Sequence, residues 1–179
     1  MKELPYILRL RNALKPEFRN MPLFQNGSAI ITERTNENGA KEILLAYKTD
    51  RDQWAVPGGL QELGETFEVV ALRELLEETG LRVKPEDLVL IDAVSGETRK
   101  NSYPKNGDQV YNNTMLYKTC KFTGDLKSEQ SEEPWDFGGG CFEMNKEIKE
   151  VQWFSLTALP DNLMDKDLIE RYLEKHSKD

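Results

Sequence analysis

The sequence is poor in the residues that build disulfide frameworks and zinc sites. It holds two cysteines, Cys120 and Cys141, and one histidine, His176, which lies near a charged terminus. Two cysteines at this spacing indicate neither a metal site nor a disulfide framework, and reduced thiols in a cytosol are the simplest interpretation. We therefore expect neither histidine catalysis nor a histidine-ligated zinc ion.

Long apolar runs are missing as well. No stretch approaches the ~20 apolar residues of a membrane span. The first residues lack the apolar core of a signal peptide, because charged side chains interrupt them: Lys2, Glu3, Arg9 and Arg11. The sequence therefore predicts a cytoplasmic protein without membrane contact.

Basic residues are outnumbered by acidic ones. The chain has 24 Lys and Arg against 32 Asp and Glu, which gives a net charge of −8 and a pI of about 4.9. Surfaces that bind nucleic acid are basic, so no stable nucleic-acid binding is expected. A small anionic ligand is compatible with this charge, because metal ions and a few local Lys or Arg residues supply positive charge where it is needed.

Length and patterning predict one α/β domain over residues 1–179, in which residues 1–20 form an extension that the sequence does not place. A helix or an edge strand is expected over 4–14. A C-terminal helix is expected over 163–175, with these core contacts: Leu163, Leu168, Ile169 and Tyr172. Strands are expected over 23–33, 41–48, 88–98, 109–122 and 151–154, with a hairpin turn over 35–39.

The most informative stretch begins at Gly59 and has the sequence GLQELGETFEVVALRELLEETGL. It predicts a helix over 66–79, because Thr66 is a suitable N-cap and Gly80 supplies a C-terminal stop. One apolar face is expected from residues at i, i+3 and i+7: Val69, Leu72 and Leu76. Three carboxylates are expected on the opposite face: Glu74, Glu77 and Glu78.

Carboxylates at i, i+3 and i+4 repel one another by a few tenths of a kcal/mol per pair. Water, basic neighbours or a metal relieves that repulsion, and ligands that are all oxygen favour Mg²⁺ or Mn²⁺. The pair Glu77-Glu78 by itself would be ordinary solvated charge. The full spacing is different, because seven fixed letters at roughly 6% usage each occur by chance on the order of 10⁻⁹ times per starting position.

This spacing resembles the Nudix box and matches it at every specified position: Gly59, Glu65, Arg73, Glu74, Leu75, Glu77, Glu78, Gly80 and Leu81. The flanking segments 54–59 and 151–156 are also similar to the family. The resemblance implies an α/β/α sandwich with a mixed sheet flanked by helices. It also implies a metal-dependent hydrolase that cleaves the diphosphate of a nucleoside diphosphate linked to another group.

The resemblance also implies the metal ligands, for Mg²⁺ or Mn²⁺. Glu74 and Glu78 are the expected main ligands, Glu77 binds or supports the metal, and the carbonyl of Gly58 is a further ligand. Arg73 is expected to orient the glutamates through an ion pair, with either Glu65 or Glu77.

The expected catalytic set is Arg73, Glu77, Glu78 and Glu147. The identity of the general base varies in this family, and Glu147, seven residues before Phe154, is the preferred candidate. Glu147 is equally compatible with being one of several surface acids near Lys146 and Lys149. Less favoured candidates for the base lie on the loop before it: Glu129, Glu132 and Glu133.

Candidate substrate contacts lie outside the box: Arg99, Lys105, Gln109, Tyr111 and Trp135. Basic residues of the loop 99–108 are placed to meet phosphates, or they belong to a solvated hairpin. Gln109, Tyr111 and Asn113 alternate along a strand, where they face a nucleobase or line a polar sheet surface. Trp135 and Phe137, on the loop 128–141, stack on a base or anchor the loop.

Markers of a particular substrate are mostly absent. Relatives that hydrolyse ADP-ribose often have a proline beyond the box, where this chain has Glu97. The sequence therefore predicts a general hydrolase that sanitises the nucleotide pool and acts on a nucleoside triphosphate or a nucleotide sugar. An ADP-ribose pyrophosphatase-like enzyme and a non-catalytic nucleotide-sensing module stay open as alternatives. A homodimer is a further expectation from the family.

Overall fold

The computed structural model describes residues 6–15, 18, 21–102, 109–127, 133–136, 142–145 and 147–176. The helices are α1 (Tyr6–Ala13), α2 (Phe67–Thr79), α3 (Lys166–His176) and the short 3₁₀ helices η2 (Pro85–Asp87) and η3 (Glu97–Arg99). The strands are β1 (Leu23–Thr35), β2 (Lys41–Lys48), β3 (Gln53–Ala55), β4 (Gly58–Leu60), β5 (Val89–Val94), β6 (Lys100–Ser102), β7 (Gln109–Thr119), β8 (Glu133–Asp136), β9 (Phe142–Asn145) and β10 (Ile148–Ser155).

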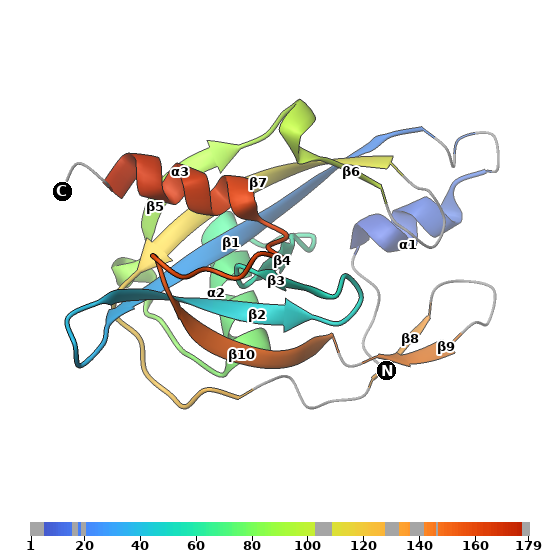
Figure 1. Cartoon of the computed structure of the whole chain (residues 1–179). Coiled ribbons are helices and arrows are strands. Elements are labelled where there is room, and N and C mark those ends of the chain that lie inside the picture. The colour runs from blue at the N-terminus through green and yellow to red at the C-terminus, as the bar shows by residue number, and fades with distance from the viewer. Residues whose placement is uncertain are drawn as a thin grey trace.

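The main sheet runs in the order β10-β2-β1-β7-β5 (Figure 1). Its central pair, β1 and β7, is parallel from Leu23↔Val110 to Thr32↔Thr119, and the other neighbours are antiparallel. Short strands extend it, because β3 pairs with β2, β4 with β1 and β6 with β7. The mixed sheet that the sequence predicts is therefore confirmed.

Helices α2 and α3 cover opposite faces of this sheet (Figure 1). Successive side chains of a strand point to opposite faces, and β1 shows the consequence. Ile30 packs in the cluster that contains α2, whereas Ala29 and Ile31 pack in the cluster that contains α3. Both faces of β1 are thus buried, which confirms the α/β/α sandwich.

Several element boundaries differ from the prediction by a few residues. The strand expected over 88–98 ends at Val94, because the chain turns at Gly96, whose φ of 100° does not occur in an extended strand. The helix expected from residue 163 begins at Lys166. Leu163 precedes it, forms an isolated bridge with the buried Trp54 and packs, partly buried, against the core.

The box helix begins and ends where the sequence predicts. Thr66 accepts a hydrogen bond from the N–H of Val69 at 3.4 Å, and Gly80 adopts the left-handed conformation with φ 81°. Gly80 also donates its N–H to the carbonyl of Leu76, as a C-cap does.

The predicted faces of this helix are wrong. Val69 is 47% exposed, whereas Val70, Ala71 and Leu75 are fully buried. Glu78 is only 1% exposed, so it lies on the inner side of the helix and not on a solvated face. The error arises because hydrophobicity alone does not distinguish a buried functional carboxylate from a surface one.

The remaining predictions on composition are tested only in part. None of the helices within the described ranges is long and apolar enough to cross a membrane. Cys120 is a free, exposed thiol, and Cys141 lies outside the described residues.

The corrected helix face gives a stability prediction. Leu75→Ala should lower the free energy of unfolding by about 2–5 kcal/mol, because it opens a cavity in the cluster beneath α2. The control Val69→Ala, on the exposed side of the same helix, should change it by less than about 0.5 kcal/mol. Urea unfolding followed by circular dichroism measures both, and equal losses in the two variants would contradict the assignment.

Candidate active site

The carboxylates of α2 lie against strand β4. The N–H of Gly58 donates to Oε2 of Glu78 at 3.3 Å. A Cβ atom on Gly59 would overlap the carboxylate of Glu74, so only glycine allows this approach. The two glycines before the box helix therefore bring backbone and buried carboxylates into direct contact.

Arg73 ties these carboxylates to the preceding loop. Its Nε and Nη2 donate to the two oxygens of Glu65 at 2.7 and 3.0 Å, a paired geometry that suits a guanidinium. Its Nη1 donates to Oε1 of Glu74 at 2.6 Å, and Oε2 of Glu77 lies farther away at 3.8 Å. Of the two partners expected for Arg73, Glu65 makes the close pair.

Lys48 is part of this cluster, although sequence reasoning did not single it out. Its Nζ contacts Oε1 of Glu78 and lies 3.3 Å from Oε1 of Glu147. Burial alone would lower the pKa of Lys48, but the charges of Glu78 and Glu147 raise it above its ordinary value. The signal in the sequence was a lysine at the end of an otherwise apolar strand, Ile43-Leu44-Leu45-Ala46-Tyr47-Lys48.

Burial also perturbs the acids. Burial, together with the charges of Glu74 and Glu147, raises the pKa of Glu78 to about 8 against the opposing charge of Lys48. Burial likewise raises the pKa of Glu74, against the opposing charges of Arg73 and Lys48. The site thus concentrates more negative charge than its two basic residues neutralise.

This donor set fits a hard divalent cation. All of the candidate ligands are oxygen atoms, and burial makes uncompensated carboxylates costly. Among the described residues, however, no three acidic side chains converge into a preformed metal cage. The ammonium group of Lys48 lies beside Glu78 and Glu147 instead.

A hollow of about 140 Å³ lies beside β4. Its lining includes Gly58, Gly59, Lys48, Asn112 and Thr114. Because Gly58 and Gly59 also contact Glu78 and Glu74, the backbone of β4 borders both the hollow and the carboxylates. A second hollow, of about 290 Å³, shares part of the wall of the first: Arg99, Asn112, Met164 and Asp165.

Arg99 lines both hollows, but its charge is already paired. Its Nη1 donates to Oδ1 of Asp167 at 2.9 Å and lies 3.4 Å from Oδ1 of Asp165. Its Nη2 donates to Oγ1 of Thr114 at 3.1 Å. Arg99 is therefore placed at the hollow as expected, although it is neutralised by two aspartates that the sequence did not indicate.

The strand residues predicted to face a base lie on the other side of β7 from the hollow. Tyr111 packs against Phe24, with ring centroids 5.8 Å apart, and Asn113 donates to Oδ1 of Asn26 at 3.1 Å. The hollow is lined by Asn112 and Thr114 instead. Alternation predicts which residues share a face, but it does not say which face meets the ligand.

The remaining candidates give no test of the prediction. The carbonyl of Gln109 accepts a hydrogen bond from Arg11 at 3.0 Å, and Gln109 is absent from the lining of both hollows. Lys105 and Phe137 lie outside the described residues, as do Glu129 and Glu132. Trp135 belongs to β8, of which the structure describes the backbone pairing only.

Comparison with known proteins agrees with this fold. The chain is 28% identical to putative nudix hydrolase 6 of Caenorhabditis elegans over 101 residues, which span 55% of this chain and 39% of that relative. The fold is similar to the MutT NUDIX hydrolase of Burkholderia pseudomallei, with a TM-score of 0.60, 20% identity and coverage of 86% and 98% of the two chains. It is also similar to the NUDIX domain of Shewanella oneidensis NrtR complexed with ADP ribose, with a TM-score of 0.57, 18% identity and coverage of 96% and 98%.

The family model for the NUDIX domain matches residues 25–174, which is most of the chain. That range contains the complete box, the strand β4 against which its glutamates lie, and Lys48 and Glu147. The chain therefore belongs to the Nudix family.

Proposed function

We propose that this protein is a divalent-metal-dependent hydrolase that cleaves the diphosphate linkage of a nucleoside diphosphate joined to another group. One observation carries the proposal: Gly58 and Gly59 line a hollow and also contact the carboxylates of Glu78 and Glu74. A diphosphate at these glycines would lie beside the carboxylates while the rest of the nucleotide extended into the hollows.

Glu74 and Glu78 would hold the ion, with Glu77 and the carbonyl of Gly58 as further donors. Mg²⁺ or Mn²⁺ suits this oxygen-only set. When bound, the ion neutralises diphosphate oxygens and acidifies the attacking water. Arg73 keeps Glu74 oriented, because the same guanidinium also grips Glu65.

Glu147 is the proposed proton acceptor. Its side chain is about one-third exposed, so water reaches it, and Lys48 lies 3.3 Å from its Oε1. Lys48 also lines the hollow, where its positive charge favours an anionic substrate and the charge that develops on it during cleavage. Glu77 is more exposed than Glu78, which suits a supporting role.

The proposed substrate is a small nucleotide of the cytosolic pool, either a nucleoside triphosphate or a nucleotide sugar. The similarity to a MutT hydrolase supports this class. The similarity to an ADP-ribose complex of NrtR keeps an ADP-ribose hydrolase and a nucleotide-binding module as alternatives. The complete set of box carboxylates favours an enzyme over a module that only binds. Cytosolic location and a homodimer stay predictions.

A substrate panel tests the function directly. With Mg²⁺ present, the protein should release product from at least one nucleoside triphosphate, nucleotide sugar or ADP-ribose. Mass spectrometry of products formed in ¹⁸O water identifies the substrate and the phosphorus atom that water attacks. Tight binding without turnover on any member of the panel would favour the sensing module instead.

Glu78→Gln should lower turnover of the best substrate by at least about 100-fold, because it removes a proposed ion ligand but keeps the shape of the side chain. The control Glu170→Gln removes an exposed carboxylate of α3 and should leave turnover unchanged. Steady-state kinetics, with circular dichroism to verify folding, measures both variants. Full activity of Glu78→Gln would reject the assignment of the ion ligands.

Divalent ions should also stabilise the folded protein, because they relieve the excess negative charge around Glu74 and Glu78. At an ion concentration of 100 times the dissociation constant, the gain is about 2.7 kcal/mol. Thermal unfolding with MnCl₂, compared with NaCl of equal ionic strength, measures this gain. A gain of the same size in Glu78→Gln would show that the ion binds elsewhere.

A further inference from the structure

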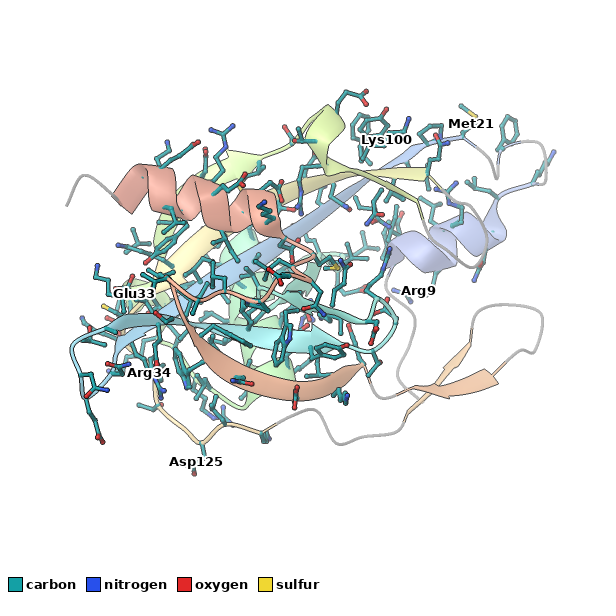
Figure 2. The ribbon with its side chains drawn as sticks, in the orientation of Figure 1. Arg9, Met21, Glu33, Arg34, Lys100 and Asp125 are labelled. Carbon is teal, nitrogen blue, oxygen red and sulfur yellow. The ribbon has the colours of Figure 1, made fainter. Side chains whose placement is uncertain are left out.

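Helix α1 contacts the loop that leads into the box helix. Glu62 lies in this loop, between β4 and α2, and its Oε1 accepts the N–H of Tyr6 at 2.9 Å. Its Oε2 accepts a hydrogen bond from Nη2 of Arg9 at 3.3 Å. Arg9 lies on α1, as labelled in Figure 2. Because Tyr6 begins α1 and its N–H has no partner within the helix, the carboxylate of Glu62 satisfies that donor from outside.

Glu62 is joined on its other side to the glutamate cluster. Its own N–H donates to Oε2 of Glu65 at 3.0 Å, and its carbonyl accepts the N–H of Glu65 at 3.2 Å. Glu65 binds the guanidinium of Arg73, which in turn binds Glu74. Hydrogen bonds and ion pairs therefore run without a break from α1 to a proposed ion ligand.

A separate anchor fixes α1 to the body of the protein. Arg11 is buried, and it donates from Nη1 to the carbonyl of Met21 at 2.9 Å and from Nη2 to that of Gln109 at 3.0 Å. These carbonyls lie just before β1 and at the start of β7. Loss of the contact at Glu62 would thus leave α1 attached while the loop lost its support.

We propose that α1 is a positioning element for the ion-binding loop. Arg9 and the N–H of Tyr6 hold Glu62, so that Glu65 and Arg73 keep Glu74 in its binding position. The inference rests on the proposed role of Glu74 as an ion ligand. It concerns a segment outside the family match over residues 25–174 and a glutamate, Glu62, that is not among the specified positions of the box.

We expect the loss of the contact between Arg9 and Glu62 to lower ion affinity and to leave the stability of the fold nearly unchanged. Arg9 and Glu62 are 45% and 35% exposed, and ion pairs so exposed contribute little to the stability of a fold. Partners one contact beyond a metal ligand typically change metal affinity 10- to 100-fold. Because Arg9 lies farther along the chain of contacts, about 3- to 10-fold is expected.

The test measures Mn²⁺ binding to the full chain by calorimetry. Arg9→Ala and Glu62→Gln should each raise the dissociation constant for Mn²⁺ about 3- to 10-fold. The double variant should have a dissociation constant no higher than that of the more impaired single variant, because both changes break the same contact. Arg9→Lys should restore most of the affinity, because it keeps the charge. The Mn²⁺ concentration needed for half-maximal activity should rise with the dissociation constant, whereas kcat at saturating Mn²⁺ should stay near wild type.

Arg34→Ala is the matched control. Arg34 is 41% exposed and pairs with Glu42 at 2.7 Å, and it lies at the opposite end of the molecule from Arg9 (Figure 2). Its removal should leave Mn²⁺ affinity unchanged. A loss of affinity in Arg34→Ala equal to that in Arg9→Ala would overturn the inference, because a general effect of surface charge would then explain both.

Hydrogen exchange separates this inference from the proposed function. In Arg9→Ala the amides of Glu62 and Glu65 should exchange at least about 3-fold faster, while that of Ile30 in β1 is unchanged. Unchanged exchange and unchanged Mn²⁺ affinity in both single variants would overturn the inference. A wild-type chain that binds no Mn²⁺ would overturn the proposed function and the link to ion affinity, and faster exchange would then support only the ordering of the loop by α1.

Discussion

The structure depends on the burial of carboxylates beside β4, a strand that begins with two glycines. Glu78 is buried and the side chain of Glu74 is only 14% exposed where the two residues contact β4. Charges in such a place are costly unless cations or hydrogen-bond donors compensate them. Part of this compensation comes from Arg73 of α2, Lys48 of β2 and the N–H of Gly58 of β4.

The two glycines of β4 allow its backbone to lie close to the neighbouring groups. A side chain on Gly58 would collide with the backbone of β1, and one on Gly59 would displace Glu74. With hydrogen atoms there instead, one short strand contacts both the hollow and the carboxylates. The pairing of β4 with β1 makes these glycines part of the sheet.

Sequence patterns predicted the local structure well, because caps, turns and alternation act over a few residues. Thr66 and Gly80 gave the ends of α2, and residues 41–48 gave β2 without error. What those patterns missed or left open concerns relations between elements. The inner face of α2, the side of β7 that meets the hollow, and the place of Lys48 depend on packing partners far away in the sequence. No short-range pattern contains that information.

The parallel pairing of β1 with β7 affects how the molecule folds. It joins strands from the two ends of a long connection, and all of β2, β4 and α2 lie within that connection. Closing a long chain segment costs conformational entropy before the contacts between its ends form. This cost slows folding in proteins of this topology. Because β4 pairs with β1, the proposed ion binding should be among the last properties to return during refolding.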